Sequence, residues 1–246
     1  MPPPSQEFYP PEFTDRSRAV LDRIHEAVPD AVLIGGWATW VRTGGAMSHD
    51  IDLIVTRPQL AVVTALAKDV SESRHVAGRK WRATHDGIHL DLYVPYESRL
   101  GQRLQLRTER LVHLQERVGT WVVLDLAGQV ATKLAALLDR PDSTPGEKDR
   151  QEIMALLAQG IDPVEAVGVV HDASTRPSAE IDRLLTDAFS YLGDLSLDQS
   201  QRRQLRHIQA EWGAASKQVL ELAPRDPELD RSRPSPEPPG PGPELR

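Results

Sequence analysis

The chain contains no cysteine, and this absence removes several classes of protein. It excludes disulfide bonds, metal sites built on thiolates and a cysteine nucleophile. No apolar run approaches the ~18 residues that a membrane-spanning helix needs, so we expect no such segment. The first residues, Met-Pro-Pro-Pro, lack the basic-then-apolar order of a signal peptide. The expected compartment is therefore the cytoplasm.

Positive charge is also scarce over the 246 residues. The chain has 29 Lys and Arg against 36 Asp and Glu, a formal net charge of −7. A protein that coats nucleic acid would be basic, so this class is excluded, although a local basic groove is not. The hydrophobic share of 39% is ordinary for a globular protein.

The 20 prolines are concentrated at the two ends of the chain, which marks the domain boundaries. Residues 1–13 are predicted to form an extended N-terminal arm. Residues 224–246 have too few apolar side chains to offset the entropy of ordering, so we predict a disordered tail. Between them we expect an α/β domain over residues 14–125 and a helical domain over residues 126–223.

Hydrophobic periodicity predicts an α+β fold, in which a mixed sheet precedes a helical half. Strands are predicted over 31–34, 51–55 and 121–124, and a hairpin over 80–94 that turns at Asp86-Gly87. Helices are predicted in the first half over 14–28, 37–41 and 60–70. In the second half they are predicted over 127–139, 147–158, 163–171, 178–192 and 198–221.

Asp50 and Asp52 are the first candidate site residues. Side chains on a strand alternate between its two faces, so these carboxylates point the same way. They repel each other unless a cation lies between them, and Mg²⁺ (or Mn²⁺) is the natural partner. The alternative is a pair of solvated acids at the end of a strand.

Asp91 lies among polar residues that alternate with Ile88, Leu90, Leu92 and Val94. If this strand lies beside 51–55, three acids converge and can hold two metal ions that clamp the oxygens of a phosphoryl displacement. Asp91 would then act as general base or as a further metal ligand. The alternative is the polar outer face of a sheet.

Gly35 and Gly36 follow an apolar strand and precede a predicted helix. Glycine allows the backbone to approach a phosphate closely, and the first turn of a helix offers free amide groups. Most Gly-Gly pairs are simply turns, but this pair stands a short distance before the two acids.

These residues resemble the nucleotidyltransferase superfamily of the DNA polymerase β type. Its pattern is an apolar strand, Gly-Gly or Gly-Ser, a gap, Asp-x-Asp and a later strand with a third acid. The five residues that match it are Gly35, Gly36, Asp50, Asp52 and Asp91. The second glycine is often serine in the superfamily, so one hydroxyl contact to phosphate is missing here.

Within the superfamily, the chain is most similar to the AbiEii-type nucleotidyltransferase toxins, which include the MenT toxins. The similarity covers roughly residues 30–160. It includes Gly35-Gly36-Trp37-Ala38, Arg42 before the acids, Lys133, Arg140 and Lys148-Asp149. It implies transfer of a nucleotide from a nucleoside triphosphate to an acceptor, such as the 3′ end of a tRNA, and a partner antitoxin protein.

The same resemblance suggests a role for the remaining charged residues. Lys133 and Arg140, on a mostly apolar predicted helix, would neutralise the triphosphate, and Arg42 would lie near the nucleotide. Asp149 would orient Lys133 or Arg140. The alternatives are a lysine whose stem is buried while its charge reaches solvent, and an ordinary surface ion pair.

A run of arginines between residues 99 and 117 is a candidate acceptor groove. Arginine suits phosphate because its planar fork offers several donors. Arg99, Arg103 and Arg107 are the proposed contacts, and Arg79, Lys80 and Arg82 on the hairpin are predicted to belong to the same groove. A charge run is also compatible with a solvated face.

The sequence therefore predicts a metal-dependent nucleotidyltransferase with an RNA acceptor. Two rivals stay open. One is an enzyme that modifies a small molecule of the antibiotic kind. The other is an inactive nucleotidyltransferase fold that serves as a binding or antitoxin module, and the retention of all three acids speaks against it.

Overall fold

The computed structural model describes residues 8–75 and 78–222. Helix α1, Pro11–Ala27, begins before the predicted start at residue 14, because proline is well suited to a first turn. Residues 11–13 of the predicted extended arm are thus helical. Residues 8–10 of the arm belong to no helix or strand, while residues 1–7 and the predicted tail at 224–246 lie outside the described residues.

A seven-stranded sheet forms the centre of the first half, in the order β3-β4-β5-β2-β1-β9-β8. The strands are β1 Val32–Ile34, β2 Ile51–Ile54, β3 Lys68–His75, β4 Gly78–His85, β5 Ile88–Tyr93, β8 Gln115–Val118 and β9 Trp121–Leu124. β1 runs parallel to β9 and β2 runs parallel to β5, whereas the other neighbours are antiparallel. The strand that carries Asp91 thus lies beside β2, which is the condition under which the three acids can converge.

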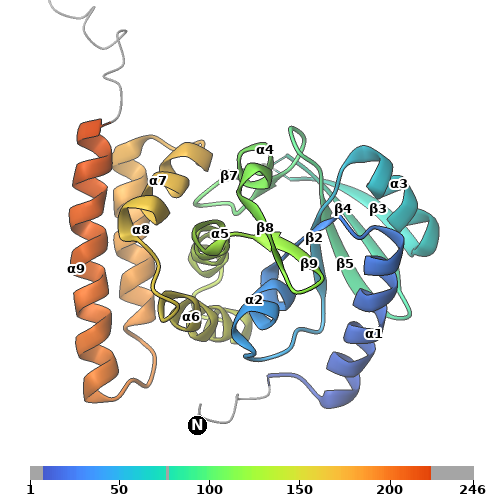
Figure 1. The fold of residues 1–246 in the computed structure, drawn as a ribbon, viewed down its shortest axis with the longest axis horizontal. Coiled ribbons are helices and arrows are strands. Elements are labelled where there is room, and N and C mark those ends of the chain that lie inside the picture. Colours follow the sequence, from blue (N-terminus) through green and yellow to red (C-terminus); the bar gives the residue numbers. More distant parts are fainter. Residues whose placement is uncertain (1–7, 76–77, 223–246) are drawn as a thin grey trace, which may run out of the picture.

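Helices cover the two faces of this sheet unequally (Figure 1). α1 and α3, Arg57–Leu66, lie against one face, where Val20, Leu53 and Leu90 share a buried core. On the other face, α5, Leu126–Asp139, packs against the β1 side chains Val32 and Ile34. Helix α2, Gly35–Thr43, follows β1 directly and contacts α5 and α6, Thr144–Leu157.

The helical half continues with three further helices stacked beyond α5 and α6 (Figure 1). They are α7 Pro163–Ala173, α8 Ser178–Leu192 and α9 Gln199–Leu222. Their apolar faces join the core that also contains Val32 and Ile34. Every helix predicted after residue 126 is present, so the α+β class with a helical second half is confirmed. None of the described helices is long and apolar enough to cross a membrane.

The structure differs from the sequence prediction at the edges of the sheet. Helix α3 ends at Leu66, and 68–75 form edge strand β3 instead of a last helical turn. Edge strand β8 was not predicted, nor were the short strands β6, Arg99–Leu100, and β7, Leu106–Arg107, followed by helix α4, Thr108–Leu111. Edge strands are rich in polar residues because they bury little surface, so they lack the hydrophobic signal of a central strand.

Candidate active site

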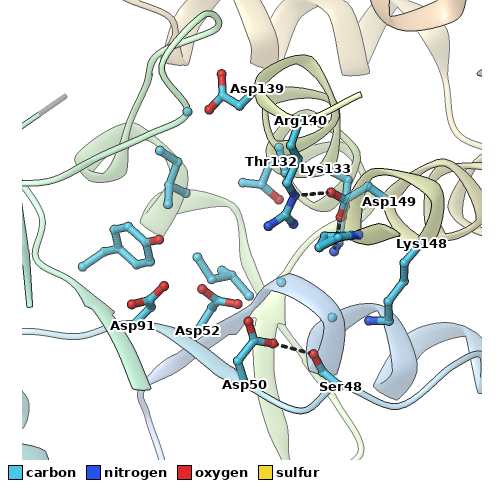
Figure 2. A pocket seen from close by; sticks show the side chains of 18 of the residues that line it. Ser48, Asp50, Asp52, Asp91, Thr132, Lys133, Asp139, Arg140, Lys148 and Asp149 are labelled. Atoms are coloured by element: carbon cyan, nitrogen blue, oxygen red, sulfur yellow. Dashed lines mark hydrogen bonds and ion pairs between the residues drawn. The ribbon is translucent and has the colours of Figure 1, made fainter. Parts of the chain in front are cut away.

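A pocket of about 400 Å³ opens between the sheet and helices α5 and α6. Its size is at the lower end of the ~300–1,000 Å³ range of small-molecule sites. It gathers most of the predicted site residues, namely Gly35, Gly36, Asp50, Asp52, Asp91, Lys133, Arg140 and Asp149. Figure 2 shows the three carboxylates on one side of this pocket, with Lys133 and Arg140 facing them from the other.

Two parallel strands form the first side, which we call the carboxylate wall (Asp50, Asp52 and Asp91). Asp52 on β2 stands directly beside Asp91 on β5 in the register of the sheet. Asp50 lies just before β2, two residues from Asp52, so the strand period places both carboxylates on the same face. Topology thus brings together acids that are far apart in the sequence.

Gly35 lies directly against the Asp52 side chain of this wall. It has a φ of 68°, and a Cβ atom added there would lie 2.4 Å from Oδ2 of Asp52. Glycine is therefore required twice, for its backbone conformation and for the space beside the carboxylate. The close approach places the first turn of α2 against Asp52.

The charge of Asp52 in the carboxylate wall is poorly compensated, whereas Asp91 pairs with Lys80 and Arg82. Burial, followed by repulsion from Asp50 and Asp91, raises the pKa of Asp52 to about 8. Burial also raises the pKa of Asp50, but the Ser48 hydroxyl, which donates a 2.7 Å hydrogen bond, and the neighbouring His49 outweigh it and hold this pKa below its usual value. The wall is therefore set up to gain from a bound cation.

Helices α5 and α6 form the second side, which we call the cationic wall (Lys133, Arg140 and Lys148). Nζ of Lys133 lies 3.1 Å from Oδ1 of Asp149 and 2.5 Å from Oε2 of Glu152. Nε of Arg140 donates to Oδ2 of Asp149 over 2.8 Å. The prediction that Asp149 orients Lys133 and Arg140 agrees with these contacts.

Glu152 and Lys148 were missed as site residues by the sequence analysis. The ammonium of Lys148 lies 2.9 Å from Oε1 of Glu152, so Glu152 joins Lys133 to Lys148. Both residues are 5% exposed, and Lys133 and Asp149 are similarly buried. A signal was present, because two opposite charges in positions i and i+4 fall on one face of a helix.

The position of Lys148 also explains the second glycine. A Cβ atom on Gly36 would lie 2.6 Å from Nζ of Lys148 and 2.7 Å from Oγ of Ser48. The absence of a side chain at residue 36 lets the ammonium approach the start of α2. The position of the Lys148 ammonium therefore depends on a glycine at residue 36, and this contact lies where the two walls meet.

Lys80, which the sequence analysis included in the candidate acceptor groove, lines this pocket. Its ammonium pairs with Oδ2 of Asp91, and Arg82 Nε lies 3.3 Å from Oδ1 of the same carboxylate. Lys80 and Arg82 alternate along β4, and Arg82 faces Asp91 in the antiparallel register. Asp91 is therefore shared by two cations.

Two tyrosines complete the pocket. Tyr93 follows Asp91 on β5 and lines the site, and burial raises its pKa well above its usual value. Tyr9, from the N-terminal arm, lies with its ring centroid 3.9 Å from that of His49 and 5.9 Å from Nζ of Lys148. The predicted arm thus reaches the site, although no sequence pattern indicated that Tyr9 would do so.

Four predicted site residues lie outside this pocket. Arg42 donates to the carbonyl of Leu124 over 2.9 Å and pairs with Glu116, at the far end of α2. We correct its expected place beside the nucleotide, because the helix carries it away from Gly35. The other three are Arg99, Arg103 and Arg107.

Two of those arginines bind the helical half of the protein. Arg103 lies 2.6 Å from Oδ2 of Asp187 and 3.3 Å from the Tyr191 hydroxyl, both on α8. Arg107 donates to the backbone carbonyls of Asp172 and Ala173 at the end of α7. Their role in binding an acceptor stays a prediction.

The residues present suit a hard divalent cation. The carboxylate wall offers oxygen ligands, which Mg²⁺ and Mn²⁺ prefer, and the raised pKa of Asp52 reports negative charge that lacks a partner. In the described part of the chain, no three His, Asp or Glu side chains form a ready-made metal cluster. The carboxylates are neighbours in register, and they would have to turn toward one ion to bind it.

Comparisons with known proteins add little to these observations. No protein-family model matches the chain. No curated protein matches it either. Among solved structures, it is similar to an antigenic nucleotidyltransferase-like protein from Paracoccidioides brasiliensis, with a TM-score of 0.40 and 13% identity over 78% of this chain and 92% of that one.

Proposed function

We propose that the protein is a metal-dependent nucleotidyltransferase that moves a nucleoside monophosphate from a nucleoside triphosphate to an acceptor hydroxyl. The observation that carries this proposal is the facing of the carboxylate wall and the cationic wall across one pocket. A polyphosphate suits both walls. Its oxygens can bind the cations of one wall directly, and they can bind the metal ions that the acids of the other wall would hold.

The triphosphate would lie between α2 and the cationic wall. Gly35 and Gly36 line the pocket at the first turn of α2, where backbone amide groups can meet phosphate oxygens. Lys133, Arg140 and Lys148 supply three positive charges, and Asp149 and Glu152 hold them in place. Fixed charges of this kind stabilise developing negative charge without reorganising during the reaction.

Asp50, Asp52 and Asp91 would hold Mg²⁺ or Mn²⁺ ions. A bound divalent ion neutralises phosphate charge and favours ionisation of an attacking hydroxyl. The chain itself positions the acceptor hydroxyl and receives its proton at Asp91, whose carboxylate is held by Lys80 and Arg82. Ser48 fixes the carboxylate of Asp50 through its 2.7 Å hydrogen bond.

The acceptor that we propose is RNA, such as the 3′ end of a tRNA, with the protein acting as the toxin of a toxin–antitoxin pair. This part rests on the motif resemblance of residues 30–160 to the AbiEii and MenT toxins. The AbiEii-type assignment includes an antitoxin protein as partner. An enzyme that modifies an antibiotic-type molecule would share the pocket but label no RNA.

The test is transfer of a labelled nucleotide from each of the four nucleoside triphosphates, with Mg²⁺ or Mn²⁺, onto total tRNA. Wild type should label tRNA, and Asp52→Asn should label none. Asp86→Asn is the matched control, because Asp86 lies at the turn of the hairpin and pairs with Arg23 at the surface. Failure of wild type to label RNA or any small-molecule acceptor would refute the proposal.

A further inference from the structure

A second hollow, of about 340 Å³, lies beside the pocket and shares part of its lining. It is bounded by His49, Asp50, Arg82, His89 and Asp91, with Leu90. Asp50, Asp91 and His49 also line the first pocket. Asp50 and Asp91 therefore line both cavities, and we call these two carboxylates the partition.

A partition of this kind suits a displacement at phosphorus. The attacking and leaving oxygens of such a reaction lie roughly in line on opposite sides of the phosphorus atom. A donor bound on the cationic wall fills the first pocket. A second substrate in the second hollow can reach Asp91 without displacing the donor.

Arg82 gives the second hollow its chemical character. It contacts Asp91 through Nε at 3.3 Å, while its side chain is 58% exposed. The outer edge of the guanidinium is thus available to a phosphate, which it can bind through two parallel hydrogen bonds. His89 adds an exposed imidazole, and His49 lies opposite at the partition.

The open face of β4 extends this surface away from the partition. Lys80, Arg82 and Thr84 alternate along β4 and face the same side, whereas Trp81 and Ala83 are buried in the core beneath. The cross-strand partners on β3 are Ser73 beside Lys80 and Ser71 beside Arg82. Cations and hydroxyl groups thus lie on one exposed sheet face that leads to Asp91.

This face contains the hairpin part of the predicted acceptor groove, Lys80 and Arg82, but not its arginine run between residues 99 and 117. Arg103 and Arg107 use their guanidinium groups to bind α7 and α8. Arg82 lies directly beside a carboxylate of the proposed reaction and remains largely exposed. The residues beside the partition are therefore better placed to meet an acceptor.

We propose that the second hollow and the open face of β4 form the acceptor site, and that they take the 3′ end of single-stranded RNA. The proposal rests on the proposed nucleotidyltransferase function. The exposed guanidinium of Arg82 offers donors to the phosphates of such a strand, next to the Asp50 and Asp91 carboxylates that line the same hollow. A hollow of about 340 Å³ accommodates a terminal nucleotide and not a duplex, and unpaired ends are the form in which bases are free to be bound.

The proposed reaction transfers a nucleotide to the terminal hydroxyl of the RNA. The terminal hydroxyl oxygen of the RNA forms a bond to the α-phosphorus of the nucleoside triphosphate. The bond from that phosphorus to the oxygen bridging to the β-phosphate breaks, and pyrophosphate leaves with the bonding electron pair. The hydroxyl proton passes to the carboxylate of Asp91. Arg82 holds the phosphate that precedes the terminal nucleotide.

The first experiment measures binding alone. A 5′-fluorescent single-stranded RNA oligonucleotide is titrated with full-length protein at several salt concentrations, and its anisotropy is followed. Arg82→Gln should weaken binding roughly tenfold and reduce the slope of log K against log salt by about one. Arg82→Lys should recover part of the affinity, because a single charge remains.

Arg117→Gln is the matched control. Arg117 is 59% exposed in its side chain and pairs with Asp30 over 2.6 Å, so it resembles Arg82 in exposure and in having a carboxylate partner. It lies on β8, at the edge of the sheet opposite to β3 and β4. Its loss should leave RNA binding unchanged. Equal affinity of wild type and Arg82→Gln would overturn the acceptor site.

The second experiment uses the same RNA in nucleotide transfer. Arg82→Gln should raise the KM for RNA while leaving the KM for the nucleoside triphosphate unchanged. An unchanged KM for RNA, or transfer to a small molecule alone, overturns the acceptor site but keeps the nucleotidyltransferase. Arg82-dependent binding without transfer by wild type refutes the nucleotidyltransferase and still supports an RNA site.

Discussion

The two walls of the pocket carry opposite charges and are stabilised in different ways. On the cationic wall, Lys133 lies within 3.1 Å of Asp149 and 2.5 Å of Glu152, so its charge is matched inside the protein. On the carboxylate wall, Asp52 lies between two other acids, and its pKa rises to about 8. The charge of Lys133 on the cationic wall is thus balanced within the protein. The charge of Asp52 on the carboxylate wall is not, and a bound cation would balance it. The difference predicts opposite effects of mutation on stability.

Asp52→Asn is expected to have the largest effect. Transfer should fall by roughly 100- to 1,000-fold, because a charge worth several kcal/mol to the reaction is removed. The metal-free variant should nevertheless melt about 5 °C higher than wild type at pH 8, since a destabilising charge is gone. Thermal unfolding in EDTA and transfer assays with Mg²⁺ measure the two effects.

The same variant gives a signed pH dependence. The pKa of Asp52 is higher in the folded protein, about 8, than in the unfolded chain, about 3.9. The folded state therefore loses stability as pH rises from about 4 through 8, where the carboxyl ionises. The advantage of Asp52→Asn should grow over this window. An advantage that is equal at pH 5 and pH 8 would contradict the assignment.

Lys133→Met should destabilise the protein where Asp52→Asn stabilises it. Asp149 and Glu152 would each lose one of two cationic partners while remaining buried, and Arg140 and Lys148 would still pair with them, so the expected cost is about 1.5–3 kcal/mol. The double variant Lys133→Met/Glu152→Gln should recover part of that loss, because one of the two acids that lost a partner is then neutral. Urea unfolding measures stability for both proteins.

Transfer activity separates structure from function in that pair. The double variant should remain inactive, since the cation that binds the triphosphate is still missing. Recovery of both stability and activity would show that Lys133 only balances Glu152. The cationic wall would then be structural, and the contrast between the two walls would be lost.

The glycines at the junction of the walls should differ in their tolerance of a methyl group. Gly35→Ala introduces a Cβ at 2.4 Å from Asp52 and forces alanine into a φ of 68°. Gly36→Ala meets the end of the flexible Lys148 side chain and both Oγ and Cβ of Ser48, at a residue with no positive φ. We expect about 2–3 kcal/mol of destabilisation for the first and about 1 kcal/mol for the second.

The kinetic effect of Gly36→Ala is the sharper measurement. Displacement of the Lys148 ammonium should raise the KM for the nucleoside triphosphate several-fold. Lys148→Met should raise it similarly, and the two changes together should be less than additive. Additive effects would show that the glycine and the lysine act independently.

The central part of the fold and the carboxylate wall could be predicted from the sequence. Alternation on β5 and the Asp-x-Asp of β2 fix which way the acids point, and short apolar runs mark the strands that carry them. Their meeting in register depends on parallel pairing of β2 with β5. The sequence analysis left that pairing as a condition, because periodicity alone does not determine which strands are neighbours.

The cationic wall was only partly predictable, for a physical reason. The pairing of Lys133 with Asp149 follows from the packing of α5 on α6, which no local pattern determines. Glu152 was missed because an acid near a lysine on a helix usually forms a solvated pair. Edge strands β3 and β8 were missed because their residues are mostly polar.

Arg103→Ala should give the smallest effect and tests the other use of arginine in this molecule. Its bonds to Asp187 and Tyr191 join the segment after β6 to α8, and its side chain is partly exposed. Loss of such a pair costs about 1 kcal/mol or less, so a small decrease in the midpoint of unfolding is expected. RNA affinity should stay within about twofold of wild type, because this guanidinium is occupied within the protein. Arg183 lies on α8 itself, and Arg183→Ala is the control for a general loss of positive charge. A marked loss of RNA affinity in Arg103→Ala without any loss of stability would return the acceptor to the 99–107 segment and away from the open face of β4.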